Sequence, residues 1–210
     1  MQLIENLKWR YATKKMDASK KVSEQDINYI KEAVRLSASS YGLQPYKVLE
    51  IESAQLKEEL KPISWNQSQI TDASHLFVFC NFLQVDEQDV DDLISLKSEI
   101  NTLPIDKISG YGDFVKGKLK EKSEIEMFHW TAKQTYIALS NAMNACAELQ
   151  IDCTPMEGFE NDAYNKKLGL TEKGLNACLL LAIGYRANED VAQNSKKVRK
   201  QINTIFEKIN

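Results

Sequence analysis

The sequence has few of the residues that build metal centres or disulfide frameworks. It contains four cysteines and two histidines among 210 residues, and no two cysteines form a C-x-x-C pair. A zinc site or a disulfide scaffold shows itself by closely spaced ligands or by a framework of regularly spaced cysteines. Most of the cysteines stand in apolar surroundings, where a buried free thiol is the common arrangement. We therefore expect neither a bound metal nor a disulfide.

Long apolar runs and an excess of positive charge are also missing. The longest apolar stretch, residues 177–184, is far shorter than a helix that spans a bilayer. The N-terminal residues carry charge from Glu5 onward, which is untypical of a signal peptide. The formal net charge of -3 gives no field that would hold a nucleic acid or an anionic membrane. We expect a cytoplasmic protein with neither kind of partner.

Glycine-rich phosphate loops are missing as well. Gly110, Gly112 and Gly117 follow a G-x-G-x4-G spacing, and no apolar strand precedes them. A Rossmann fingerprint needs a strand, a tight turn and a helix together, and the chain has no G-x4-G-K-[ST] segment either. A nucleotide would therefore be bound by side chains and scattered backbone groups.

The residues that are present predict one α+β domain. Hydrophobic residues make up 43% and charged residues 27%, which is usual for a folded chain. Apolar residues recur at helical spacing over 24–37 and over 124–150, which predicts a helix in each range. At the start of the first, Ser23 and Asp26 resemble a capping box. Apolar runs at 47–51, 76–80 and 175–185 predict strands. Residues 84–122 are highly charged and weakly periodic, which predicts an excursion of short helices and loops, and a helix is expected at the C-terminus.

Four separated segments resemble, in order and spacing, the motifs of the nitroreductase family. The first, Arg10-Tyr-Ala-Thr-Lys14, is similar to the family's R-x-S-x-[KR] element. Residues 37–40 with Gln44-Pro45 are similar to its P-S-S-x-N-x-Q-P-W loop. The third segment, residues 66–69, leads through 72–75 into the LFVFC strand, and the fourth is PMEGF at 155–159, followed by residues 197–199. The resemblance is nearest to the oxygen-insensitive NAD(P)H nitroreductases, also described as dihydropteridine reductases.

This resemblance implies a fold, an activity and an assembly. The fold would be a single domain over residues 1–210, with a mixed, mainly antiparallel sheet flanked by helices and residues 84–122 over the flavin. The activity would be that of an FMN-dependent NAD(P)H oxidoreductase. NAD(P)H would reduce the flavin, and a nitroaromatic, quinone or pteridine would then take two electrons at the same place in a ping-pong reaction. The flavin carries the chemistry, so no catalytic side chain is required. The assembly would be an intertwined homodimer with FMN at the interface.

The resemblance also assigns roles to residues. Arg10, Lys197 and Arg199 would bind the FMN phosphate, since guanidinium and ammonium groups suit a phosphate monoester. Lys14 would stabilise negative charge at the N1–C2=O end of the reduced ring. The further cofactor contacts would be Tyr11, Ala12, Ala38, Ser39, Ser40, Gly42, Asn66, Gln69, Pro155, Glu157 and Gly158. Of these, the loop 38–42 would reach the FMN held by the partner subunit. Tyr111 and Phe114 are predicted to contact the substrate.

Two positions depart from the subgroup's pattern. Ala12 stands where the family often has serine, which removes one hydroxyl donor near the cofactor. Gln69 stands where a second lysine can occur, and a neutral amide can hydrogen-bond the flavin O2 but supplies no charge. Both departures leave the flavin potential and the substrate preference open.

Other interpretations stay open beside this one. Taken singly, each segment fits a structural role as an exposed helix end, a turn or a solvated basic face. A specialised flavin enzyme of the same fold, such as a dehalogenase or a flavin-destroying enzyme, would share the motifs. A helical interaction protein without a cofactor, binding a partner through its basic C-terminal face, is the alternative from another class.

Overall fold

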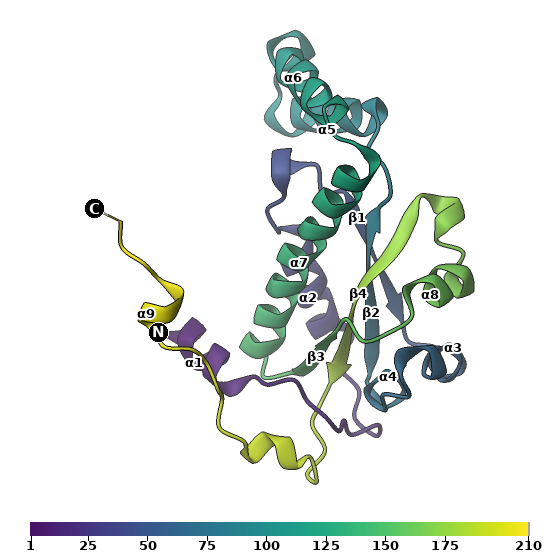
Figure 1. Cartoon of the computed structure of the whole chain (residues 1–210), viewed down its shortest axis with the longest axis vertical. Helices are drawn as coiled ribbons and strands as arrows, with labels where there is room; N and C mark the ends of the chain where they lie inside the picture. The colour runs from purple at the N-terminus through teal and green to yellow at the C-terminus, as the bar shows by residue number, and fades with distance from the viewer. Residues whose placement is uncertain (210) are drawn as a thin grey trace.

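A four-stranded sheet lies at the centre of the computed structural model, which describes residues 1–209 (Figure 1). Its strands are β1 (Tyr46–Ile51), β2 (His75–Phe82), β3 (Asp152–Met156) and β4 (Leu175–Gly184), in the spatial order β1-β2-β4-β3. All three strand pairs are antiparallel. The α+β class and the mainly antiparallel sheet are confirmed. Within residues 1–209 the parallel component is limited to an isolated bridge between Ala12 and Cys153.

Alternation along the strands gives the sheet two buried faces. Phe77 and Phe79 of β2 point to one face, where they join a core that includes Ile27 and Ile30. Leu76, Val78 and Cys80 point to the other face, into a separate core. Because successive side chains of a strand point to opposite sides, a strand covered on both sides reads as a continuous apolar run. This explains why the LFVFC segment is apolar throughout.

Helices cover both faces and complete a three-layer arrangement (Figure 1). One face is covered by α2 (Glu24–Arg35) and α7 (Glu124–Glu148). The other is covered by α3 (Ala54–Leu60), α4 (Gln69–Asp72) and α8 (Asn161–Leu168). Short 3-10 turns lie at Ser40–Gly42, Pro62–Ser64, Ile105–Lys107, Thr171–Lys173 and Val191–Asn194.

The two helices predicted from periodicity both form, and each begins at a capping serine. The Ser23 hydroxyl accepts the Asp26 N–H at the start of α2. Ser123 and Glu126 form a reciprocal capping box at the start of α7. Such boxes satisfy backbone N–H groups that have no partner inside the helix. The apolar stripe of α7 then packs along α2 and the sheet.

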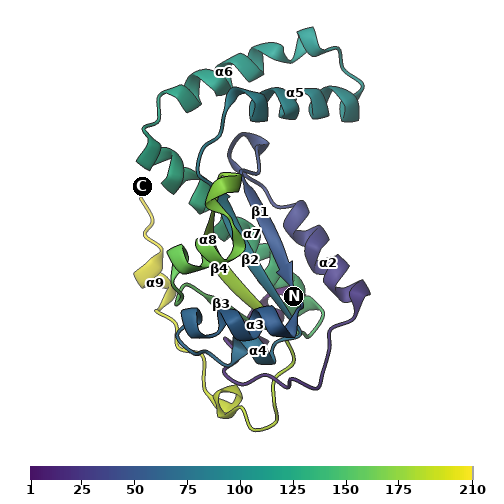
Figure 2. The same cartoon turned by 90° about the vertical axis from the view of Figure 1, so that its right-hand side faces the viewer.

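The excursion is more regular than the sequence predicts. It forms a hairpin of two full helices, α5 (Glu87–Asn101) and α6 (Ser109–Lys120), which projects from one end of the molecule (Figure 2). Gly112 lies inside α6, where a Cβ atom would stand 2.9 Å from Ile94 Cγ1. This glycine therefore allows α5 and α6 to approach closely. The presence of Gly112 is explained by helix packing and not by a phosphate-binding loop.

The two ends of the chain are less regular than the middle. At the N-terminus, α1 (Gln2–Trp9) forms as a short helix, and Asn6 donates a hydrogen bond to Glu148 of α7. The expected C-terminal helix is limited to α9 (Ile202–Ile205), and the basic residues at 196–200 precede it in a segment that is not helical. The four cysteines are unpaired. No helix within residues 1–209 is long and apolar enough to cross a membrane.

Candidate functional site

The two ends of the chain meet at a pocket of about 580 Å³. Residues 8–14 form one wall, residues 192–199 form another, and Pro155 of β3 adds to the lining. The pocket brings together seven of the predicted site residues, namely Arg10, Tyr11, Ala12, Lys14, Pro155, Lys197 and Arg199. Segments that are almost 190 positions apart in sequence are thus adjacent in space. We call this group the cationic site.

Three cations of the cationic site lie close together, and none of them forms an ion pair with a residue that the structure describes. Among the described residues, Arg10 Nε is a buried side-chain donor without a hydrogen-bond partner. Lys197 Nζ donates to the carbonyl oxygens of Leu7 and Arg10. Loss of water contact, followed by the neighbouring charges of Arg10 and Arg199, lowers the pKa of Lys197. A buried donor without a partner is costly, so the arrangement favours an anionic ligand.

The segment that carries Arg10 to Lys14 is held in place by a partly buried ion pair. Arg186 donates to Asp152 through Nε, at 3.0 Å, and through a terminal nitrogen, at 2.7 Å. The same guanidinium lies 4.6 Å from the ring centres of both Trp9 and Tyr11. Because Asp152 begins β3, this contact fixes the N-terminal segment against the edge of the sheet.

A second buried acid fixes the other side of the segment. Asp190, only 2% exposed, accepts hydrogen bonds from the Tyr11 hydroxyl at 2.9 Å and from the N–H groups of Lys14 and Lys15 at 2.9 and 3.3 Å. Burial on its own raises the pKa of Asp190, but these bonds outweigh it and hold the pKa below its usual value. Burial and the bond to Asp190 raise the pKa of Tyr11 to about 12. Tyr11 is therefore a neutral donor at pH 7.

Gln69 contacts the segment from Arg10 to Lys14 at Thr13. Its side chain is 7% exposed, and Nε2 donates to the Thr13 carbonyl at 3.3 Å. Thr154 Oγ1 donates to the same carbonyl at 2.7 Å. The structure thus places Gln69 beside the Ala12–Lys14 stretch, where it acts as a support for the backbone.

The turn that carries Asn66 packs against Gly158 through Trp65. Trp65 and Asn66 both have positive φ angles, of 55° each, which turns the chain sharply. The Trp65 ring lies against Gly158, where a Cβ atom would stand 2.7 Å from the ring. Gln67 donates to the Gly158 carbonyl at 2.7 Å, while the Gly158 N–H donates to no atom of the described residues. That N–H is available to a ligand.

Glu157 is joined to the long helix. Its carboxylate accepts a hydrogen bond of 2.7 Å from the Tyr136 hydroxyl of α7. This bond, with burial as the second cause, raises the pKa of Tyr136 to about 12. The predicted backbone contacts of Glu157 and Gly158 thus lie between α7 and the Trp65 turn.

The loop 38–42 lies away from the cationic site in the same chain. The Tyr111 hydroxyl of α6 donates to the Tyr41 carbonyl at 3.2 Å, so the loop lies beside the excursion. The excursion and α1 stand at opposite ends of the long helix α7 (Figure 1). Ser39 accepts the Gln44 N–H and Ser40 N–H donates to Gln134, which fixes the loop shape. The predicted residues in this group are Ala38, Ser39, Ser40 and Gly42.

The predicted substrate residues belong to this second group. Phe114 packs edge-on against Tyr41, with ring centres 6.5 Å apart, and Tyr41 also contacts Trp130 at 6.1 Å. Lys97 lies 4.2 Å from the centre of the Tyr111 ring. We call this group, formed by loop 38–42, Tyr111, Phe114 and Trp130, the aromatic site.

Sequence reasoning missed several residues that position the predicted cofactor contacts. Trp65 could have been noticed as an aromatic residue directly before Asn66 in a polar turn. Asp190 carries no local signal, because an isolated acid in a loop is usually exposed. Tyr136 is one exposed position on a long helix, and its contact with Glu157 depends on tertiary structure.

Comparison with known proteins identifies the family. The profile of the Nitroreductase family matches residues 7–185. The chain belongs to the nitroreductase family. The Major NAD(P)H-flavin oxidoreductase of Aliivibrio fischeri is 34% identical over 211 residues, with 97% of each chain covered. YfkO of Bacillus subtilis, named as an NAD(P)H nitroreductase, is 35% identical over 199 residues, with 90% of each chain covered.

Solved structures of nitroreductases share the fold along its whole length. The Bacillus subtilis protein ydfN superposes with a TM-score of 0.89 at 18% identity, covering 99% of both chains. A nitroreductase of Exiguobacterium sibiricum in complex with FMN gives a TM-score of 0.85 at 21% identity, covering 99% of this chain and 97% of the other. The nitroreductase-like fold predicted from the motifs is confirmed.

Proposed function

We propose that this chain is an FMN-dependent NAD(P)H oxidoreductase. Its relative from Aliivibrio fischeri is named for NAD(P)H and flavin, and the Exiguobacterium structure contains FMN. The observation in this chain that carries the proposal is the convergence of Arg10, Lys197 and Arg199 with an unpaired buried donor on Arg10. Three cations and an unsatisfied guanidinium nitrogen fit a phosphate monoester.

Lys14 of the cationic site, together with Asn66 and Gly158, fits the ring of the cofactor. Lys14 would place a positive charge near the end of the ring that gains negative charge on reduction. The Gly158 N–H and the Asn66 amide would hydrogen-bond the polar edge. Trp65, between these two residues, would fix their separation. The bound flavin itself would supply the two-electron transfer, so the side chains bind and orient.

We propose a homodimer in which the aromatic site of one chain completes the cationic site of the other. The C-terminal segment extends away from the body of the chain (Figure 1) and exposes apolar side chains at Val198, Ile202, Ile205 and Phe206. Several exposed large apolar side chains on one short segment are typical of an interaction site. A segment reaching across a second copy would bury these residues and produce an intertwined assembly.

The reaction would be ping-pong, with NAD(P)H and the acceptor using the same face in turn. Nitroaromatics, quinones and pteridines are the acceptors that the site favours, because the aromatic site offers flat apolar surfaces. The dihydropteridine reductase subgroup remains part of this proposal.

One preparation tests the proposed function. The purified protein should be yellow and release FMN on denaturation, and it should oxidise NADH or NADPH stoichiometrically when a quinone is added. Parallel initial-rate lines at several quinone concentrations would support ping-pong kinetics. A colourless protein that fails to take up added FMN would instead favour the interaction protein without a cofactor.

A further inference from the structure

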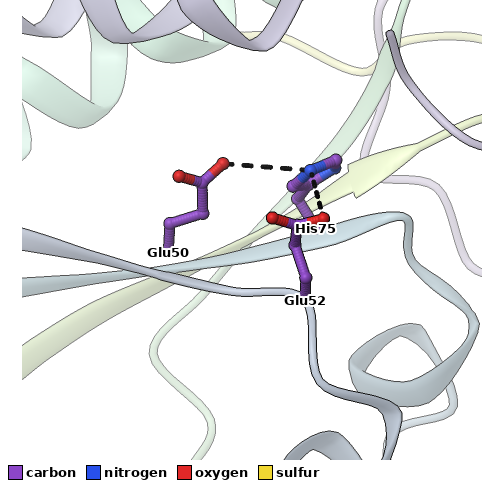
Figure 3. Close-up of side chains that lie close together, drawn as sticks. All are labelled: Glu50, Glu52 and His75. Carbon is purple, nitrogen blue, oxygen red and sulfur yellow. Dashed lines mark ion pairs between the residues drawn. The ribbon is translucent and has the colours of Figure 1, made fainter. Parts of the chain in front are cut away.

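A second cluster of polar side chains lies at the far edge of the sheet from the cationic site. Glu50 lies near the end of β1, Glu52 directly follows this strand, and His75 begins β2 (Figure 3). β1 is the edge strand opposite β3, which carries Pro155 of the cationic site. The pocket beside this cluster shares no lining residue with the cationic site. The cluster is therefore separate from the proposed flavin site.

The register of the two strands brings the three side chains to one face. Ile51 pairs with Leu76, and continuing this register places Glu52 opposite His75. Glu50 lies two residues before Glu52 and so points to the same face of the strand. These residues are separated in sequence, and their proximity follows from strand pairing, which is why composition alone predicts no metal.

The imidazole of His75 is oriented toward the two carboxylates. Its side chain is only 9% exposed, and Nδ1 is hydrogen-bonded to Ser74 Oγ at 3.0 Å. Nε2 lies 3.5 Å from Glu52 Oε2 and 3.8 Å from Glu50 Oε1, beyond ordinary hydrogen-bond length (Figure 3). Metal-binding histidines commonly use one ring nitrogen for a fixed partner and the other for the ion. The Ser74 contact gives His75 this arrangement.

We propose that Glu50, Glu52 and His75 bind a divalent transition-metal ion of the zinc type. The candidate ligand atoms all lie within 4.8 Å of one another. Bonds of about 2.0–2.2 Å to a tetrahedral ion put neighbouring ligand atoms roughly 3.4 Å apart, so small side-chain adjustments suffice. One nitrogen and two carboxylate oxygens suit zinc, whereas magnesium and calcium prefer oxygen ligands alone.

Neighbouring side chains orient one of the two carboxylates and leave space beside the ion. Lys31 pairs with Glu50 Oε2, which leaves Oε1 directed toward His75. The adjoining pocket of about 340 Å³ is lined by Lys21, Lys31 and three glutamates, and the third of these is Glu24. The pocket leaves a side of the ion open, which a water molecule or an external ligand would occupy, as in zinc sites with three protein ligands.

The test uses the flavin-loaded protein after removal of metals with a chelator. Zn²⁺ is titrated calorimetrically, and Co²⁺ serves as a visible probe of coordination geometry. We expect saturable binding of one ion per chain, with Mg²⁺ giving no comparable binding. Glu52→Gln removes the charge of a carboxylate that is 69% exposed, so the fold should tolerate it. This variant should weaken Zn²⁺ binding by about tenfold or more, since even residues behind the ligands cost that much.

A matched control lies on the rim of the same pocket. Glu24→Gln removes an equal charge from a residue that is not a ligand and should weaken Zn²⁺ binding much less than Glu52→Gln does. His75→Gln should abolish the Co²⁺ spectrum, and the FMN content of each variant reports that it has folded. The proposal is overturned by absence of saturable binding or by equal affinity of wild type and Glu52→Gln. It is also overturned if alkylation of the cysteines abolishes binding while the variants do not, because the ion would then be bound by thiols.

Discussion

The cationic site and the aromatic site differ in chemistry and in position. The first gathers Arg10, Lys14, Lys197 and Arg199 where the chain ends meet. The second gathers aromatic rings under the excursion, at the other end of α7. Charges suit a phosphate, and flat apolar rings suit a flat acceptor. Since one chain holds these groups apart, a single site containing both requires two chains.

Disruption of the C-terminal segment should have the largest effect on this arrangement. The double variant Ile202→Asp with Phe206→Asp puts charges on two exposed apolar positions, of which Phe206 is 71% exposed in the isolated chain. If these residues are buried across the dimer, each change should cost about 2 kcal/mol or more of association free energy. Sedimentation velocity should then show monomers that have lost FMN.

The matched control for that experiment is Tyr29→Asp, which changes an exposed aromatic residue of α2 outside both sites. This variant should remain dimeric and yellow. A wild-type protein that sediments as a stable FMN-loaded monomer at low micromolar concentration would contradict the two-chain site.

Asp190 makes the cationic site sensitive to acid. Asp190→Asn removes the negative charge of a carboxylate that accepts four hydrogen bonds. The donors are the Tyr11 hydroxyl and the N–H groups of Lys14, Lys15 and Ala192. Hydrogen bonds to charged groups contribute about 1.5–3 kcal/mol, so unfolding free energy should fall by roughly 2 kcal/mol at pH 7. The pKa of Asp190 is held below its usual 3.8. Its contribution is therefore complete above that pH and lost as the pH falls through the lower folded-state value.

Urea unfolding of wild type and Asp190→Asn across a pH series checks this sign. The two free energies should differ at neutral pH and converge below about pH 4, near the ordinary pKa of aspartate. A difference that grows toward low pH would mean that Asp190 does not stabilise the fold through its ionised form.

Arg199→Ala tests the phosphate end of the comparison directly. Removing one charge-assisted hydrogen bond should cost about 1.5–3 kcal/mol, or roughly one to two decades in FMN affinity. Lys200→Ala is the control, because Lys200 is exposed and does not line the pocket. Fluorescence titration with FMN measures both. Equal dissociation constants for the two variants would place Arg199 on the solvated surface.

The parts of the fold that sequence predicts are those with strong local patterns. The period of α7 determines its structure because one continuous stripe of the helix is buried, and the apolar runs of β2 and β4 do so because both faces of these strands are buried. Pro155 was also open to interpretation as a turn residue. It occurs within β3, which tolerates proline because it is an edge strand of the sheet.

The remaining features depend on tertiary contacts or on signals that are easily overlooked. The excursion has charges on much of its surface, so its period is weak, yet Asp86 and Asp89 form a capping box at the start of α5. That pair could have predicted the helix. The hydrogen bonds of Asp190 and the pairing of Glu52 with His75 follow from chain crossings and strand register, which no local pattern records.

Phe114→Ala probes the aromatic site with a smaller expected effect. An aromatic contact adds about 0.5–1.5 kcal/mol, so KM for a quinone should rise by roughly fivefold while FMN affinity stays the same. Leu103→Ala, at an exposed position between α5 and α6, provides the control. A loss of FMN affinity without a change in KM would indicate that Phe114 contacts the cofactor and not the acceptor.

Lys14 gives the smallest effect and tests the orientation of the flavin ring. If its ammonium lies near the end of the ring that becomes negative, it stabilises the reduced form more than the oxidised form. Two charges about 4 Å apart at an effective dielectric near 20 interact by up to about 4 kcal/mol, and solvent exposure should reduce this to roughly 1 kcal/mol. Lys14→Ala should therefore lower the two-electron midpoint potential by about 20 mV. Lys15→Ala is the matched control, since Lys15 pairs with Glu189 at 2.9 Å and does not line the pocket. Equilibration with a reference dye measures both potentials, and an equal shift in the two variants would show that Lys14 acts only through general charge.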